Sequence, residues 1–336
     1  MPDLLTVSER GLYCEAGDFF IDPWRPVNRA VITHAHSDHA RAGMGKYFCS
    51  ASGVGVLAHR VGKDSPIHGI PYGEEHQING VKVSLHPAGH VLGSAQVRVE
   101  HRGEVWVASG DYKVVADPTC AQFEPVKCHT FISESTFGLP IYRWQSSEAI
   151  FAEINRWWAG NIEHERTSVL FGYSLGKAQR LLAGVDASLG PILVHGAVNA
   201  FLPLYKAEGV VLPETELATA ENAKTTRGRA LVVAPPSADA ESWLRKFGDI
   251  SLAATSGWMQ IRGTRRRAAA DRGFALSDHA DWDGLQQAIK ATGCTRVLVT
   301  HGYTQPMVRW LREHGYQADT LATHYEEEET AAAAAE

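Results

Sequence analysis

Three histidines and one aspartate form a dense cluster near the start of the 336-residue sequence. His34, His36, Asp38 and His39 fall within six residues, directly after the short apolar run 30–33, which predicts a buried strand. A strand end followed by a tight loop can direct such side chains toward one point. Imidazole and carboxylate groups are ligands for zinc and manganese, so the cluster predicts a metal site rather than a solvated loop.

The rest of the chain holds residues that can complete this site. His90, Asp111 and His301 each lie just beyond an expected strand, as His34 does. Asp22 also follows an apolar run, and it fits either a solvated turn or a carboxylate that orients a ligand histidine. The expected strands are 19–22, 30–33, 81–85, 95–100, 105–108, 129–132 and 296–300.

The composition is that of an ordinary globular chain, with 44% hydrophobic residues and a formal charge of −6. The sequence has no apolar run of about 18 residues and no basic, then apolar, N-terminus, so neither a membrane span nor a secretory signal is expected. The five cysteines contain no Cys-x-x-Cys pair and are expected to be free thiols in a reducing cytoplasm. The negative charge argues against nonspecific coating of nucleic acid. It does not exclude a nuclease, because bound metal ions can outweigh it locally.

Between about residues 145 and 262 the pattern changes to alternating strands and helices. A glycine-bearing turn at 172–177 opens an expected helix, and with Lys177 it could bind phosphate, although it is not a Walker A motif. The most basic stretch follows, in which four arginines lie within six residues: Arg262, Arg265, Arg266 and Arg267. These arginines could be a solvated face or, beside a metal site, could attract a polyanion.

The combined motifs resemble the metallo-β-lactamase fold in its two-metal hydrolase form. Ser-Glu-Ser-Thr-Phe-Gly at 133–138, Ser-Leu-Gly-Lys-Ala-Gln at 174–179 and Ser-Asp-His-Ala-Asp at 277–281 narrow the resemblance to the β-CASP nucleases. That group includes the mRNA 3′-end cleavage endonuclease, ribonuclease J and the Artemis-type DNA nucleases. The resemblance spans roughly residues 10 to 315 and looks closest to the bacterial ligase-associated DNA exonucleases.

The resemblance implies an α/β fold, namely a metallo-β-lactamase αββα sandwich with an inserted β-CASP α/β cap domain. Residues 1–145 and 263–325 would form the sandwich, and residues 146–262 would form the cap. Residues 326–336, acidic and rich in alanine, would be a flexible tail.

The resemblance also assigns roles to residues. One divalent ion would be held by His34, His36 and His90, and the other by Asp38, His39 and His301, with Asp111 bridging. Zn²⁺ is the expected ion and Mn²⁺ the alternative, since these ligands accept both. Two such ions lower the pKa of a shared water, so that hydroxide forms and attacks the phosphate. The catalytic residues would be Asp38, Asp111, Glu134 and His279.

His279 resembles the family's general acid, which protonates the leaving sugar oxygen, and Glu134 would orient its ring. Alone, these two residues could equally be a loop carboxylate and a histidine at a helix start. Asp22 would hold a ligand histidine in place. Nucleic-acid contacts are expected from Ser174, Lys177, Trp258, Arg262, Arg265 and Arg266.

The function implied is a cytoplasmic, metal-dependent DNA exonuclease of DNA repair, with 5′→3′ action on single-stranded or frayed ends suggested by the Artemis-type relatives. A DNA ligase and a helicase are expected partners by resemblance alone. An RNA-processing nuclease is the alternative, because related enzymes cut RNA with the same residues. A non-catalytic scaffold subunit, as in relatives that have lost ligands, is the more distant one. Metal identity, exo or endo mode and oligomeric state stay open.

Overall fold

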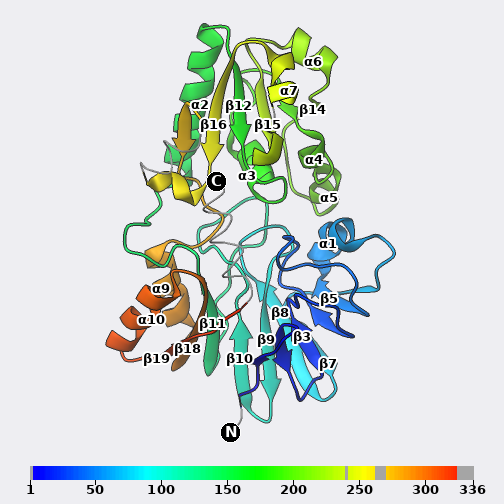
Figure 1. Ribbon diagram of the computed structural model, residues 1–336, viewed down its shortest axis with the longest axis vertical. Coiled ribbons are helices and arrows are strands. Elements are labelled where there is room, and N and C mark those ends of the chain that lie inside the picture. The colour runs from blue at the N-terminus through cyan, green and yellow to red at the C-terminus, as the bar shows by residue number, and fades with distance from the viewer. Residues whose placement is uncertain (1–2, 239–240, 262–269, 324–336) are drawn as a thin grey trace. The chain divides into compact units, whose positions relative to one another are not determined.

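The computed structural model describes residues 3–238, 241–261 and 270–323, and its chain forms two compact units (Figure 1). The first unit comprises Met1–Arg143 and His279–Glu336, and the second comprises Trp144–Asp278. Residues 270–278 therefore group with the second unit, whereas the resemblance implied that 263–325 belong to the first. The reason is strand pairing, since β17 (Arg272–Phe274) pairs in parallel with β16 (Ile250–Thr255) of the second unit. The expected tail lies outside the described residues.

The N-terminal part of the first unit forms a sheet of six described strands in the order β1-β2-β3-β4-β5-β6. The first pairs are antiparallel, and from β3 onward the strands are parallel. The 3₁₀ helix η1 and the helix α1 connect β5 to β6. The bounds are β1 (Thr6–Val7), β2 (Leu12–Cys14), β3 (Phe19–Ile21), β4 (Ala30–Val31), β5 (Tyr47–Ser50), η1 (Ala51–Gly53), α1 (Val54–Val61) and β6 (Ile67–Ile70).

A second sheet of the first unit has seven described strands in the order β19-β18-β11-β10-β9-β8-β7. Strands β7 to β10 are antiparallel, whereas β11, β18 and β19 are added in parallel. The bounds are β7 (Glu75–Ile78), β8 (Val81–Pro87), β9 (Ala95–His101), β10 (Glu104–Ala108), β11 (Thr130–Ser135), α9 (Trp282–Thr292), β18 (Arg296–Gly302), α10 (Thr304–Glu313) and β19 (Gln317–Thr320).

Two hydrophobic cores hold the first unit together. One core joins side chains of both sheets, including Phe48 of the first sheet and Val83 and Trp106 of the second. The other core lies where α9 and α10 cover the second sheet, as Figure 1 shows, with Leu285 and Leu311 fully buried. Each buried large apolar side chain stabilises the folded state by roughly 1.5–3 kcal/mol, so these two cores give the site a firm support.

The second unit is a parallel sheet of six described strands in the order β14-β13-β15-β12-β16-β17. Hydrophobic clusters cover both of its faces, as the apolar runs of β12 and β15 require. The bounds are α2 (Ser147–Glu163), β12 (Thr167–Phe171), α3 (Lys177–Gly184), β13 (Ile192–Val194), α4 (Gly196–Asn199), α5 (Leu202–Ala207), β14 (Glu216–Leu217), α6 (Ala220–Thr225), β15 (Leu231–Ala234), η2 (Pro236–Ala238), α7 (Glu241–Leu244), η3 (Arg245–Phe247), β16 (Ile250–Thr255), η4 (Gly257–Gln260) and β17 (Arg272–Phe274).

This arrangement confirms the predicted α/β fold class. Among the described residues, no helix is both long and apolar enough to cross a membrane. All five cysteines are free thiols.

Candidate metal centre

The histidine cluster follows β4, and a buried carboxylate organises its loop. Asp22, just beyond β3, accepts hydrogen bonds from the Thr33 backbone N–H at 2.7 Å and from the Thr33 hydroxyl at 2.5 Å. The same carboxylate lies 2.7 Å from His39 Nδ1, so it ties the start of the loop to its end. The geometry matches a carboxylate that orients a ligand histidine.

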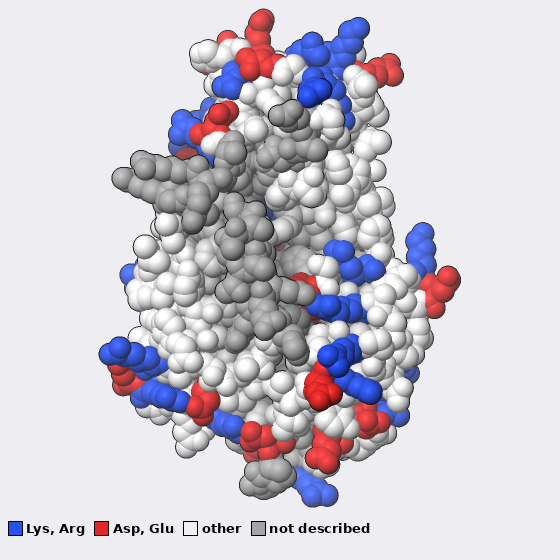
Figure 2. Space-filling model, viewed as in Figure 1, with Lys and Arg blue, Asp and Glu red and all other residues white. Residues whose placement is uncertain are grey.

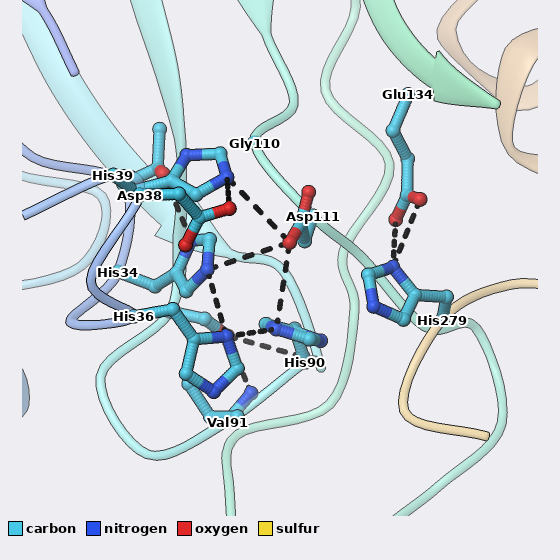
Figure 3. A network of polar contacts seen from close by, with 12 residues as sticks. His34, His36, Asp38, His39, His90, Val91, Gly110, Asp111, Glu134 and His279 are labelled. Atoms are coloured by element: carbon cyan, nitrogen blue, oxygen red, sulfur yellow. Dashed lines mark hydrogen bonds and ion pairs between the residues drawn. The ribbon is translucent and has the colours of Figure 1, made fainter. Parts of the chain in front are cut away.

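One set of possible ligands comes from three loops (Figure 3). His36 Nδ1 lies 3.1 Å from both His34 Nε2 and His90 Nε2. Asp111 Oδ2 lies 3.4 Å from His34 Nε2 and 3.7 Å from His90 Nε2. Gly110 has a φ of 56°, and a Cβ there would come within 2.6 Å of Thr33 Cβ. Glycine therefore allows the Asp111 loop to approach the histidine loop this closely.

A second set comprises His39, Asp111 and His301. Asp111 Oδ2 lies 3.7 Å from His39 Nε2, and the rings of His39 and His301 stack with centroids 5.4 Å apart. Asp111 belongs to both sets, which is the position required of a bridging carboxylate. Asp38 stands beside the second set rather than within it, with Oδ2 at 3.5 Å from His39 Nε2.

A β-bulge directs His301 toward the site. In the parallel pair of β11 and β18, Glu134 pairs with Thr300 and Ser135 pairs with Gly302, so His301 is an extra residue on its strand. Its φ of 57° is left-handed, and the Ser135 hydroxyl donates to the His301 carbonyl at 2.5 Å. Bulges commonly re-aim a side chain in this way next to functional sites.

The donor set fits a divalent metal ion. One ring nitrogen carries either one hydrogen or one lone pair, so His36 Nδ1 cannot make full hydrogen bonds to both His34 and His90 at 3.1 Å. A cation between the rings can take one lone pair from each. Imidazoles with a carboxylate are also an established donor set of catalytic zinc sites.

Burial and neighbouring charge set the protonation of these groups. Burial and the nearby His39 hold the pKa of His34 well below its usual value, and they lower the pKa of His301 to about 3. Both rings are therefore neutral at pH 7, which is the metal-binding form. Burial raises the pKa of Asp111 to about 7, although His39 opposes the shift.

His39 differs from the other ligand histidines. Burial alone would lower its pKa, but the carboxylates of Asp38, Asp111 and Asp22 outweigh burial and raise the pKa well above its usual value. This concentration of negative charge favours any cation at the position, whether a proton or a metal ion. A bound metal would displace the proton, because metal ligands must be deprotonated.

Glu134 and His279 form a pair beside these two sets (Figure 3), and together with Asp111 they make a third group whose atoms could hold a metal ion. His279 Nδ1 lies 3.1 and 2.9 Å from the two Glu134 carboxylate oxygens, and its ring centroid is 4.7 Å from that of His90. The Tyr112 backbone N–H donates to Glu134 at 2.7 Å, and the Thr136 hydroxyl donates at 2.6 Å.

These contacts keep the buried carboxylate ionised. Burial raises the pKa of Glu134, but the charge of His279 and the accepted hydrogen bonds outweigh it and hold the pKa below its usual range. A Glu134 carboxylate fixes the hydrogen of His279 on Nδ1, since a carboxylate can only accept. Thr136 was not predicted as a partner of Glu134, although its place two residues after Glu134 in one motif was the available signal.

Three of the residues expected to contact nucleic acid are described, and they follow two adjacent parallel strands of the second unit, β12 and β16. Lys177 is only 3% exposed, and its ammonium lies 3.0 Å from the Asp278 carboxylate. A phosphate contact by Lys177 stays a prediction, and the burial of this side chain inside the second unit does not support it. Ser174, in the turn before α3, and Trp258, in η4, are half-buried. Arg262, Arg265 and Arg266 lie outside the described residues.

The face drawn in Figure 2 has no broad patch of Lys and Arg among the described residues. Among the described residues on the face in Figure 2, Lys and Arg lie interspersed with Asp and Glu. Attraction for a polyanion at this face would therefore come from local features such as bound cations.

The comparisons with known proteins give relatives for most of the chain. A "Probable DNA ligase" of Opitutus terrae is 32% identical over 92% of this chain and 30% of its own length. The "DNA cross-link repair 1A protein" of Homo sapiens is 30% identical over 46% of this chain and 16% of its own length. "Endoribonuclease ysh-1" of Neurospora crassa is 30% identical over 43% of this chain and 17% of its own length. The chain thus spans less than a third of the length of these curated relatives.

No protein-family model matches the chain. A solved structure, a protein of unknown function from Enterococcus faecalis, covers 88% of this chain and 79% of its own with a TM-score of 0.59 and 11% identity. That likeness concerns the fold alone.

The mixed α/β fold and the clusters of histidine and aspartate that could hold a metal ion are features shared with the class of metal-dependent hydrolases. Within that class, the chain belongs to the metallo-β-lactamase/β-CASP nuclease family, as the sequence motifs predicted.

Proposed function

We propose that this chain is a two-metal-dependent phosphodiester hydrolase that degrades DNA as an exonuclease in DNA repair. The observation that carries the proposal is the Glu134–His279 contact at 2.9 Å beside two possible ligand sets, with Asp111 common to both sets and within reach of the pair. Hydrolysis of a phosphodiester needs both functions, because an attacking oxygen must be activated and a leaving oxygen must be protonated.

The fold proposal follows the same family. The first unit, with two sheets that share a core, would be the metallo-β-lactamase sandwich. The second unit, with a parallel sheet covered on both faces, would be the β-CASP cap domain.

We assign the ligand roles by the two sets. His34, His36 and His90 would hold one ion, His39 and His301 with Asp38 the other, and Asp111 would lie between them. When bound, two divalent ions supply an activated water and neutralise charge on the phosphate, and Zn²⁺ or Mn²⁺ suits these donors. Asp22 keeps His39 in its ligand orientation through the 2.7 Å contact at Nδ1.

His279 supplies the proton to the leaving sugar oxygen in this proposal. Its Nδ1–H is directed at Glu134, so Nε2 is the atom that delivers the proton. The Tyr112 N–H and the Thr136 hydroxyl keep the Glu134 carboxylate in the orientation that the ring requires. Proton transfer of this kind contributes about 10²–10⁴-fold to the rate.

Two relatives support DNA as the substrate, namely those named as a probable DNA ligase and a DNA cross-link repair protein. Relatives named as endoribonucleases support RNA as the second candidate, with the same residues in the same roles. A ligase partner and a 5′→3′ direction on single-stranded or frayed ends complete the DNA proposal.

A time course on matched substrates tests the proposal. Single-stranded, duplex and frayed DNA and the same sequences as RNA, labelled at either end, are incubated with the full chain and Zn²⁺ or Mn²⁺. We expect mononucleotides to be released from the 5′ end of DNA, and no release by Asp111→Asn. Faster cleavage of RNA would favour the second candidate, and no cleavage of any substrate would contradict hydrolysis.

A further inference from the structure

Two cations of the turn and helix start at residues 174–180 have contacts inside the second unit. Lys177 and Arg180 begin α3, and both are almost fully buried, at 3% and 5% exposure. A side chain that contacts a nucleic acid must reach solvent, and these two cations instead point into the second unit. Their partners are three consecutive residues near its end.

Each of residues 276, 277 and 278 is contacted by at least one of these two cations. Lys177 Nζ donates to the Leu276 carbonyl at 2.6 Å and lies 3.0 Å from Asp278 Oδ2. Arg180 Nη1 donates to the Ser277 carbonyl and lies 3.1 Å from Asp278 Oδ1. We name Lys177, Arg180 and Asp278 the 276–278 clamp.

A third contact extends the clamp to another helix. Arg180 Nη2 donates to the Ser147 hydroxyl, the first residue of α2, at 2.9 Å. All three charged side chains of the clamp are at most 7% exposed. Burying three charges is costly, and apolar side chains of similar volume would often stabilise a fold equally well. The directional hydrogen bonds of an ammonium and a guanidinium, however, fix the orientation of their partners more strictly than apolar packing does.

The residue that follows the clamp is His279. Asp278 is held on one side of it, and on the other side the Ala280 N–H donates to the Tyr112 carbonyl at 2.7 Å. Consecutive Cα atoms are only about 3.8 Å apart, so a shift at Asp278 must move the His279 backbone as well. The His279 ring meets Glu134 at 2.9 Å and has little room for such a shift.

We propose that Lys177 and Arg180 are positioning residues for the His279 proton donor, acting through Asp278 and the carbonyls of Leu276 and Ser277. The proposal rests on the proposed function. Loss of a clamp contact lets the chain before His279 move, so that Nε2 is misplaced relative to the leaving oxygen. The metal ligands lie on other loops and are unaffected.

The test compares two DNA substrates that differ only in their need for a proton. One oligonucleotide has the ordinary terminal linkage, and the other has sulfur in place of the leaving oxygen. A thiolate is a much weaker base than an alkoxide and leaves without protonation. Single-turnover rates of the full-length, metal-loaded protein on both substrates therefore separate proton donation from metal binding and DNA binding.

Lys177→Met is the first variant, because it leaves Asp278 and Arg180 as a balanced ion pair. We expect its rate on the oxygen substrate to fall about 10-fold or more, since a misplacement of about 1 Å can cost 10²-fold. The rate on the sulfur substrate should change less than about threefold, with metal content unchanged. Arg180→Lys keeps the charge but loses the fork, and it should show the same selective loss to a smaller degree.

Asn161→Leu is the matched control, since Asn161 is buried in the second unit and donates to Ser168 at 2.9 Å, away from residues 276–278. This variant should not slow cleavage of one substrate more than cleavage of the other, even if its melting temperature falls as far as that of Lys177→Met. Arg180→Lys decides the matter if Lys177→Met does not fold.

Equal losses on both substrates, or no loss in either clamp variant, would overturn the proposal. So would a decrease of about one unit in the salt dependence of DNA binding by Lys177→Met, which would indicate a phosphate contact instead. If the wild-type protein cleaves neither substrate, the proposed function fails, and that outcome is distinct from a failure of the clamp.

Discussion

The ligand sets and the Glu134–His279 pair lie side by side but are built in opposite ways. In the ligand sets, several nitrogen and oxygen acceptors converge, such as His36 Nδ1 at 3.1 Å from two other ring nitrogens. In the pair, donors meet acceptors, and the Glu134 carboxylate receives Tyr112 N–H and the Thr136 hydroxyl as well as His279. The first arrangement has an excess of acceptors and favours a cation. In the second, donors already meet the Glu134 carboxylate, although Glu134 and His279 also form a possible ligand group with Asp111.

Because of this difference, we expect that metal binding and proton donation can be removed by separate substitutions. Changes in the ligand sets should remove metal and activity together, and changes in the pair should remove activity alone.

Asp111→Asn should abolish metal binding and activity together, with a rate loss of about 10⁴-fold or more, since Asp111 is the only carboxylate common to both ligand sets in the described residues. Metal content by elemental analysis and cleavage of labelled DNA measure the two effects. Asp64→Asn, at an exposed loop position, is the control. Normal metal content in Asp111→Asn would refute the bridging role.

His279→Ala should reduce turnover by about 10²–10⁴-fold while metal content stays at the wild-type level. The reason is that His279 contacts Glu134 and is absent from the two ligand sets proposed to hold metal, although it forms a third group of possible ligands with Asp111 and Glu134. His164→Ala, an exposed histidine at the end of α2, controls for the loss of an imidazole. Loss of metal in His279→Ala would mean that the two regions are not separable.

Metal affinity should fall as the pH is lowered below about 7, the value to which burial raises the pKa of Asp111. Below this pH the carboxyl group binds a proton that the metal must displace in addition to the proton on His39, so the affinity should decrease by about tenfold more per pH unit below pH 7 than above it. Competition titration with a chromogenic chelator from pH 5 to 8 measures the two slopes. An equal slope on both sides of pH 7 would contradict a ligand role for Asp111.

Thr136→Val should reduce turnover by about tenfold, because the Glu134 carboxylate loses one of its hydrogen bonds and orients His279 less firmly. Thr136→Ser should restore most of the rate, and neither variant should lose metal. Thr292→Val, at a buried threonine of α9 away from the site, is the matched control. An equal loss in that control would assign the effect to general stability.

The strand-end pattern made much of the first unit predictable. The expected hairpin 95–100 and 105–108 is present as β9 and β10, and the strands that precede His34 and His301 are present as β4 and β18. A strand of this kind depends on the apolar character of neighbouring residues, so it can be predicted from a single sequence. The segment that contains α1, β6 and β7 carried weaker signals, because its short strands alternate with exposed polar residues.

Lys177 shows why a motif does not by itself assign a role. Its glycine-bearing turn and helix start suit a phosphate contact equally well as a buried ion pair. Only the tertiary structure shows the ion pair, because its partner Asp278 lies about a hundred residues later along the chain and 3.0 Å from the lysine.

The types of side chain in the site and the order of its first ligands were predictable from the sequence alone, because His34 to His39 lie on one loop after one strand. Tertiary structure decided that Asp111 faces both ligand sets, that a bulge in β18 turns His301 inward, and that Glu134 meets His279. The physical reason is that a loop's residues are positioned by their own backbone, whereas residues 145 positions apart are positioned by strand register and by the packing of two cores.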